Sequence, residues 1–369
     1  MKWSLRIGRL AGIDVYVHVT FLLLLAWVAL MDYRATGSIA GASSGVILIL
    51  TVFAIVVLHE LGHALAARRY GIPTRDITLL PIGGVARLER MPREPVQELA
   101  IAIAGPAVNV VLAVAIWLIL TVMGIDPLGG EFVTGDALFA SVFMVRLFWV
   151  NVILALFNMI PAFPMDGGRV LRALIAMRKP HGEATEIAAR IGKFFAIVFG
   201  VAGLFALDNP FLVFIAVFIW LGASGEASAE RQAVTLAGVP TSHVMITSFR
   251  TLLPHDTLSA GMDYLLSGFQ QDFPVVSESG ELVGVLTRAS LVEALRRSGP
   301  DTHVSSVMRQ SFETASPAEP VDTALSRLRA SDLRALPVVE NHRLLGLLTM
   351  DNVGEWVMLQ TAMARTGRQ

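Results

Sequence analysis

The sequence lacks cysteine altogether and has few charged residues. With no cysteine among its 369 residues, it forms neither a disulfide framework nor a thiolate metal site, so any bound metal must be held by His, Asp or Glu. Charged residues make up only 16% of the chain, against about 25% in an average soluble domain. Because the net charge is −1, there is no basic excess for nucleic acid, and we expect no nucleic-acid partner.

The scarcity of charge is confined to the first part of the chain. Residues 1–230 contain long apolar runs, whereas residues 240–369 alternate apolar and charged residues as soluble proteins do. A membrane-spanning helix needs about 20 mainly apolar residues. About six segments approach this requirement, namely 16–31, 44–67, 99–124, 138–160, 191–207 and 210–224. We therefore predict a polytopic α-helical membrane domain followed by a soluble α+β unit.

The basic residues indicate an orientation for these spans. Arginine and lysine are concentrated before the first span, between the second and third, after the fourth and after the last. With six spans, all these segments fall on one side of the membrane, which the positive-inside rule identifies as the cytoplasm. The chain begins with a basic segment and a long apolar stretch without a clean cleavage site, which indicates a retained first span. We expect a multi-pass protein of the cell membrane with both termini in the cytoplasm.

The second span ends with the motif HExxH, from His59 to His63. Two histidines four residues apart lie on one face of a helix and can bind one zinc ion, and Glu60 can take a proton from a metal-bound water. An ionisable group within a span costs about 2.5–3.5 kcal/mol, so three such groups in five residues favour a metal site. At 1.5 Å per residue, His59 lies about 13 Å below Arg68, inside the apolar layer.

Asp166 is the candidate third ligand. Catalytic zinc usually takes three protein ligands and keeps one position open. Asp166 follows the fourth span in the sequence PMDGGR, after two prolines that break the helix and before two glycines that let the backbone turn. The predicted topology returns it to the same side as the HExxH motif. The alternative interpretation is that Asp166 caps the N-terminus of the next helix.

Several smaller features lie around these motifs. Two apolar-rich arms flank Gly83 and Gly84 between the second and third spans, which predicts a membrane-associated β-hairpin. Glu98 is expected to pair with a nearby arginine. Asn109 is expected to make a polar contact between helices, with a role near the metal as the alternative, and His18 is expected to be an interfacial or packing residue.

The soluble part contains an internal repeat. Val244-Met245 recurs 63 residues later as Val307-Met308, and the segment beginning at Leu282 recurs 62 residues later at Leu344. Each copy has the pattern of helix, strand, turn, strand and helix, so the repeat predicts a pseudo-symmetric pair. The expected domains are a membrane domain at 1–230, a linker at 231–240 and two repeats at 241–298 and 303–362.

Taken with the motif PMDGGR, the motif HELGH resembles the site-2 protease family of intramembrane zinc metalloproteases, in the branch with C-terminal tandem CBS domains. The resemblance covers about residues 5–225 for the protease. It implies that His59, His63 and Asp166 bind one zinc ion and that Glu60 is the general base. It further implies that Asn158 and Pro161, in the NxxPxxPxDG stretch, help to hold substrate near the metal. The hairpin around Gly83 and Gly84 resembles one that pairs with an unwound substrate strand.

The repeated part resembles a tandem pair of CBS domains, which often bind adenine nucleotides through the pattern Gly-h-h-Thr-x-x-Asp/Asn, where h is apolar. The second copy fits this pattern with Thr349 and Asn352, whereas the first has Thr287 but ends in Ser290. Two alternatives remain open, a nucleotide-binding pair and a pair that only dimerises or docks a partner.

We expect an intramembrane zinc protease that cuts a transmembrane substrate near its cytoplasmic end, with the CBS pair regulating it. The resemblance implies a role in regulated intramembrane proteolysis, for example of an anti-sigma-type regulator. The first alternative is a CBS-regulated membrane metal transporter that uses intramembrane His and Asp as a transit site. The second is an inactive scaffold with a structural metal. A Glu60→Gln substitution distinguishes the protease from the transporter, because transport does not need Glu60 as a base.

Overall fold

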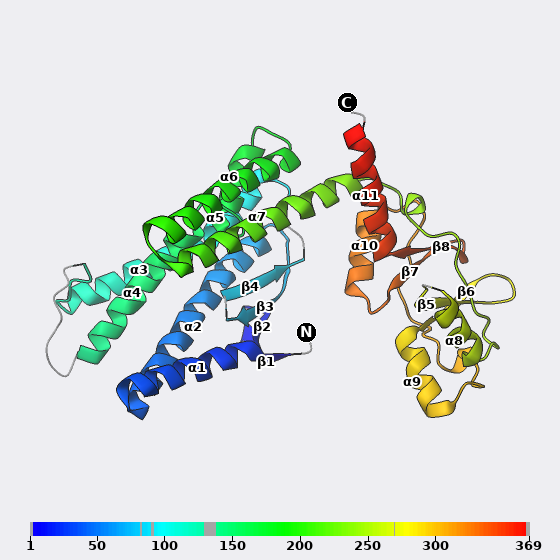
Figure 1. Ribbon diagram of the computed structural model, residues 1–369, viewed down its shortest axis with the longest axis horizontal. Coiled ribbons are helices and arrows are strands. Elements are labelled where there is room, and N and C mark those ends of the chain that lie inside the picture. The colour runs from blue at the N-terminus through cyan, green and yellow to red at the C-terminus, as the bar shows by residue number, and fades with distance from the viewer. Residues whose placement is uncertain (1–2, 82, 90–91, 129–137, 269, 367–369) are drawn as a thin grey trace. The chain divides into compact units, whose positions relative to one another are not determined.

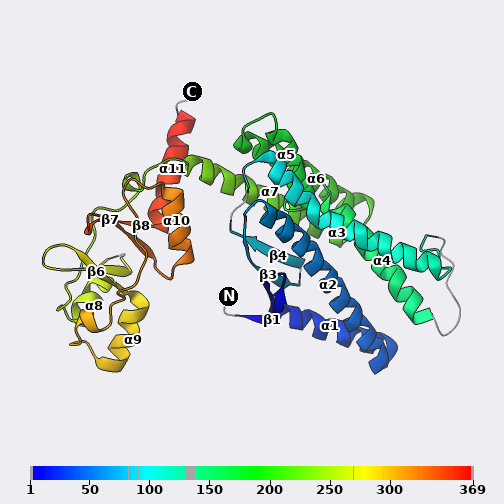
Figure 2. The same cartoon turned by 180° about the vertical axis from the view of Figure 1, so that it is seen from behind.

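The computed structural model describes residues 3–81, 83–89, 92–128, 138–268 and 270–366. The chain forms two compact units, Met1–Ser228 and Ala229–Gln369, and each is described by itself. Figure 1 and the reverse view in Figure 2 show that the first unit is a bundle of helices with a small sheet, and that the second combines short helices and strands. The predicted fold class, an α-helical membrane domain followed by an α+β unit, is confirmed.

Helices occupy all six predicted span positions in the described part of the first unit, with one further short helix, α5. Five are long and apolar enough to cross a membrane: α1, α2, α3, α7, and α6 with its π-helical continuation η1. The described apolar part of α4, Val142–Asn158, is shorter. The helices are α1 Val19–Thr36, α2 Ile39–Arg69, α3 Pro95–Val122, α4 Leu138–Asn158, α5 Asp166–Ala176, α6 His181–Val201, η1 Ala202–Ala206 and α7 Pro210–Leu236.

The predicted hairpin around Gly83 is present, but it belongs to a larger sheet. Strands β3 (Thr74–Leu80) and β4 (Gly83–Leu88) are antiparallel, and they extend a sheet ordered β1-β2-β3-β4. The apolar pattern of the sequence predicts neither β1 (Ser4–Leu10) nor β2 (Ile13–His18) and includes residues 16–18 in the first span. Alternate residues of β2 are buried, the period of a strand. His18 instead caps α1 by accepting a hydrogen bond from the Thr20 N–H at 3.3 Å.

Helix α3 lies at the centre of the first unit, where it packs against α2, α4 and α5. A buried ion cluster connects both α5 and α7 to α3. The Arg172 guanidinium of α5 donates from Nε to Glu98 Oε1 of α3 at 2.7 Å and from Nη1 to Glu226 Oε1 of α7 at 2.5 Å. Burial would lower the pKa of Arg172, but the two glutamates raise it above its ordinary value, so this side chain stays charged. The expected pairing of Glu98 with an arginine is confirmed.

The second unit contains two copies of one motif, as the repeat predicts. The first comprises α8 Leu258–Ser267, β5 Asp272–Val276, β6 Leu282–Thr287 and α9 Arg288–Ser298, and the second comprises α10 Val321–Ala330, β7 Ala335–Glu340, β8 Arg343–Thr349 and α11 Met350–Thr366. The segment before each copy pairs with a strand of the other copy, since Ile246 bridges to Leu347 and Arg309 bridges to Val285. This reciprocal pairing gives the unit a pseudo-twofold arrangement.

The stretch expected as a linker begins inside a helix. Helix α7 continues to Leu236, so only the last residues of 231–240 lie outside it. Leu236 is 2% exposed and belongs to the apolar core around β7 and β8.

The ion cluster generates a prediction about stability. An Arg172→Met substitution leaves Glu98 buried without its cation, which is expected to destabilise the protein by about 3–5 kcal/mol. The double substitution Glu98→Gln with Arg172→Met removes the uncompensated charge and is expected to recover part of that loss. Thermal unfolding of the detergent-solubilised chain measures both effects. Arg190→Met, which removes an exposed arginine paired with Glu186, is the control and should change little. Equal behaviour of the Arg172 and Arg190 variants would contradict the prediction.

Candidate metal centre

Three buried side chains converge inside the first unit. His59 and His63 project from one face of α2, and Asp166 is the first residue of α5. The His59 Nε2 atom lies 3.2 Å from Asp166 Oδ2, His63 Nε2 lies 3.1 Å from the same oxygen, and the two Nε2 atoms lie 3.1 Å apart. Each residue is at most 7% exposed. In the described part of the chain, this is the only group of three His, Asp or Glu residues close enough to hold a metal ion.

The position of Asp166 follows from the broken segment between α4 and α5. Helix α4 ends at Asn158, and the chain turns through two prolines before α5 begins. The N-cap of α5 is Met165, and no side chain caps this end. The alternative interpretation of Asp166 as a helix cap is therefore wrong, and its carboxylate faces the histidines instead.

The outer nitrogens of both histidines have partners that fix their hydrogens. His63 Nδ1 donates to the carbonyl oxygen of Ile101 at 2.7 Å, and His59 Nδ1 donates to Asn109 Oδ1 at 2.6 Å. The amide of Asn109 is oriented in turn, because its Nδ2 donates to Asn151 Oδ1 at 3.1 Å and Asn151 Nδ2 donates to the Leu147 carbonyl. Both Nε2 atoms therefore present lone pairs to the space between the three residues, the arrangement that metal-binding histidines need.

A glycine makes room for this group. A Cβ atom at position 105 would overlap His63 Nε2 and would lie 2.7 Å from His59 Nε2. Gly105 is on α3, so the absence of a side chain there allows α3 to pack directly on the two imidazole rings.

The donor set fits zinc. Two imidazole nitrogens and one carboxylate oxygen, with a fourth position left for water, form a common catalytic zinc site. Bonds of roughly 2.0–2.1 Å in a tetrahedron place ligand atoms roughly 3.4 Å apart, close to the 3.1–3.2 Å separations of these atoms. An aspartate binds a metal ion through its deprotonated carboxylate. Asp166 is therefore placed to serve as an anionic ligand.

Glu60 lies against the sheet. Its Oε2 accepts a hydrogen bond from the backbone N–H of Ala86 in β4 at 3.1 Å. A Cβ atom at Gly84 would lie 2.9 Å from Glu60 Cγ and from Val56 Cγ1. The missing side chain at position 84 thus lets the edge strand of the sheet approach the carboxylate closely.

The remaining predicted residues lie elsewhere in the two units. Asn158 donates to the Leu154 carbonyl within α4, and Pro161 is half-buried in the turn that follows. Thr287 accepts from the Ser290 N–H, and Thr349 accepts from the Asn352 N–H, so both threonines cap helices of the second unit. Sequence reasoning missed Asn151 and the Ile101 carbonyl. The role of Asn151 could have been suspected because a polar amide is unusual in an apolar span. The role of the Ile101 carbonyl could not, because every residue has a backbone carbonyl.

Comparisons with known proteins identify the families to which parts of this chain belong. The model of peptidase family M50 matches residues 47–199, and the CBS domain model matches residues 242–297 and 304–358. The chain is 33% identical over 286 residues to zinc metalloprotease MJ0392 of Methanocaldococcus jannaschii, covering 78% of each protein. It is 27% identical over 177 residues to stage IV sporulation protein FB of Bacillus subtilis, covering 48% of this chain and 56% of that protein. Among solved structures, the site-2 protease from Methanocaldococcus jannaschii matches with 36% identity and a TM-score of 0.44, over 61% of this chain and 95% of that one.

The membrane helices, the buried HExxH motif and these relatives define a zinc-dependent protease embedded in a multi-pass membrane domain. The chain belongs to peptidase family M50, the site-2 protease type, and carries a tandem pair of CBS domains.

The Asn109 contact generates a prediction about metal affinity. Replacing Asn109 with Leu removes the acceptor that orients His59, and loss of such an outer partner typically lowers metal affinity 10- to 100-fold. We expect a loss of about that size in a chelator-competition titration of the purified chain with zinc. Thr121→Val is the control, because Thr121 lies on the same helix and its hydroxyl bonds only the Trp117 carbonyl. Unchanged zinc affinity in the Asn109 variant would show that this hydrogen bond does not orient a ligand.

Proposed function

We propose that this protein hydrolyses a peptide bond of a transmembrane substrate, with zinc held by His59, His63 and Asp166 and with Glu60 as the general base. One observation carries the ligand assignment. The two imidazoles turn their N–H groups outward to oxygen acceptors and direct only lone pairs at an ionised carboxylate. Three acceptor atoms within about 3 Å of one another repel unless a cation or a shared proton lies between them, and the donor set is the one that catalytic zinc uses.

The side chains around the metal position can carry out the proton transfers of hydrolysis. When bound, zinc supplies a Lewis acid that acidifies water and polarises a carbonyl. The Glu60 carboxylate accepts a proton from the attacking water and returns it to the leaving amine. The Ala86 N–H, which bonds Oε2, holds the carboxylate in place and leaves Oε1 for the proton.

The edge strand β4 is the proposed binding place for the substrate backbone. A helical substrate hides its peptide groups in internal hydrogen bonds, so it must be extended before it is cut. Strand β4 is at the edge of the sheet and lies against Glu60, which supports addition of a substrate strand along Gly83 and Gly84. We also propose that Asn158 and Pro161 contact substrate, since they belong to the segment that leads into Asp166.

The distribution of charge supports the proposed setting. The basic segments between predicted spans support a topology with both termini and the end of α2 in the cytoplasm. Cleavage would then occur near the cytoplasmic end of the substrate and release a fragment into the cytosol. A membrane-anchored regulator of the anti-sigma type fits this geometry, and regulated intramembrane proteolysis is the proposed role.

The CBS pair is the proposed regulatory unit, with an adenine nucleotide near Thr349 and Asn352. These two residues are hydrogen-bonded to each other at the start of α11, where helix N–H groups favour a phosphate. Thr287 occupies the matching place in the first copy, with Ser290 in place of an acidic or amide residue. Calorimetric titration of the full chain with AMP tests the proposal, and absence of binding at millimolar AMP would overturn it. Dimerisation through this pair stays a prediction.

The proposed base generates a prediction that separates a protease from a metal transporter. Glu60→Gln keeps an oxygen to accept the Ala86 N–H but cannot take a proton. Cleavage of a co-expressed membrane substrate should fall at least about 100-fold, in line with loss of general-base catalysis, while zinc content stays at the wild-type value. Asp166→Ala is the comparison variant and should lose both zinc and cleavage. Undiminished cleavage by Glu60→Gln would overturn the assignment of the base, and zinc transport that survives in this variant would favour the transporter.

The close approach of β4 generates a prediction about substrate positioning. Gly84→Val places two methyl groups where Glu60 and Val56 now contact the strand, so the strand must move away from the carboxylate. We expect strongly reduced cleavage with unchanged zinc content, because neither histidine is touched. Val85→Ala is the control, since the Val85 side chain is 45% exposed. Full activity of the Gly84 variant would argue against a role of β4 beside Glu60.

A further inference from the structure

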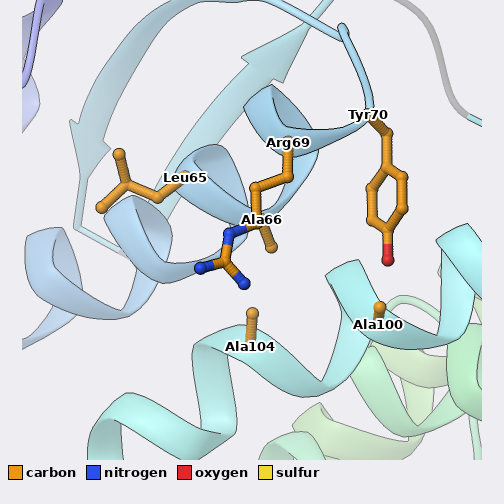
Figure 3. A pocket seen from close by; sticks show the side chains of 6 residues that line it. All are labelled: Leu65, Ala66, Arg69, Tyr70, Ala100 and Ala104. Carbon is orange, nitrogen blue, oxygen red and sulfur yellow. The ribbon is translucent and has the colours of Figure 1, made fainter.

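A cavity lies where the end of α2 packs against α3, and the function proposed above does not use it. Its volume is about 340 Å³, and it is lined by Leu65, Ala66, Arg69, Tyr70, Ala100 and Ala104. Figure 3 shows the Arg69 guanidinium and the Tyr70 hydroxyl extending from α2 toward α3, where Ala104 and Ala100 leave the space between the helices open. The cavity therefore has a cationic and hydroxyl-bearing mouth and an apolar floor.

Arg69 is the charged residue in the lining of this cavity. Within the described residues, its guanidinium has no hydrogen-bond or ion-pair partner. Two other arginines of the first unit are engaged, because Arg68 donates to the Ala11 carbonyl at 3.3 Å and Arg87 pairs with Asp76 at 2.7 Å. A planar guanidinium with free donors at the mouth of a cavity is suited to bidentate contact with a phosphate or carboxylate.

Exposed apolar side chains lie beside the cavity, where the acyl chains of a lipid could contact them. Leu65 is 41% exposed and Ile103 is 42% exposed, on the outer faces of two helices that are apolar enough to cross a membrane. Helix α2 has 31 residues, about 46 Å at 1.5 Å per residue, which exceeds the roughly 30 Å of a bilayer's hydrocarbon layer. This excess length, together with Arg68 and Arg69 in its last turn, supports a position of its C-terminal end among the headgroups, with Leu65 one turn deeper.

We propose that this cavity binds an anionic phospholipid. The phosphate accepts hydrogen bonds from the Arg69 guanidinium and the Tyr70 hydroxyl, the small side chains of Ala100 and Ala104 admit the glycerol, and the acyl chains pack on Leu65 and Ile103. A soluble phosphate matches only the polar half of this site. The lipid bridges α2 and α3, whose contact also carries the hydrogen bond from His63 to Ile101, so bound lipid should stabilise the folded membrane unit.

The test uses the full chain in dodecyl maltoside micelles and follows thermal unfolding by intrinsic tryptophan fluorescence. Dioleoyl phosphatidylglycerol should raise the unfolding temperature in a saturable manner. Dioleoyl phosphatidylcholine, which has the same chains and no net charge, and sn-glycerol 3-phosphate, which has no chains, should not. Arg69→Gln should weaken the apparent affinity for phosphatidylglycerol about tenfold, the size expected for loss of a charged hydrogen bond.

Two further variants make the outcome decisive. Arg68→Gln removes the same charge from the neighbouring residue and should keep wild-type affinity, whereas Ala100→Leu fills the cavity without changing charge and should weaken binding. Zinc content at the wild-type value in every variant confirms that the metal centre is intact. Equal losses in the Arg68 and Arg69 variants would mean a nonspecific interfacial charge effect and overturn the site. Wild-type affinity of the Ala100 variant, or an equal shift with glycerol phosphate, would overturn the lipid assignment.

Discussion

The packing of the membrane unit depends on one face of α3, whose residues provide partners for polar side chains buried in the helix bundle. Glu98, Ile101, Gly105 and Asn109 follow one another at intervals of three or four residues, so they lie along a single stripe of the helix. Glu98 binds Arg172, the Ile101 carbonyl and Asn109 take the outer hydrogens of the two histidines, and Gly105 leaves space for their rings. Because unpaired polar groups are costly in an apolar interior, this stripe constrains how α2 and α5 can pack on α3.

Two consequences for chemistry follow from that constraint. The histidines reach the metal position with their tautomers already set, so little rearrangement is needed to bind a cation. Asp166 is placed by α5, which Arg172 fastens to α3 and α7. The position of Asp166, the proposed third ligand, thus depends on an ion cluster in another part of the bundle, and loss of this cluster is expected to disturb the proposed metal site.

The proposed base is coupled to the sheet rather than to the helices. Glu60 shares a hydrogen bond with Ala86 on the edge strand, so a substrate strand added there would lie directly beside the carboxylate. The same four-stranded sheet includes β1 and β2 at the start of the chain. The N-terminal segment therefore supports the hairpin through β2, which is parallel to β3.

Motifs with a strong period were predictable from the sequence. The HExxH spacing places two imidazoles on one helical face whatever the fold, long apolar runs predict spanning helices, and a repeat with a constant offset predicts two like domains. Strands β1 and β2 were missed because apolar composition near residue 16 was assigned to the first span. Asn151 gave only a weak signal, since an amide in a span has no sequence partner that reveals its role.

The sequence by itself determined the helical spans, the paired histidines and the adjacent glutamate, because each depends on residues near one another in the chain. It also determined the duplicated unit, because two stretches of the chain repeat one pattern. Only the tertiary structure decided that Asp166 faces both histidines, that Asn109 and Ile101 set their tautomers, and that β4 lies against Glu60. These contacts join residues from 26 to 107 positions apart. They are decided by how the helices and the sheet pack, which no local spacing encodes.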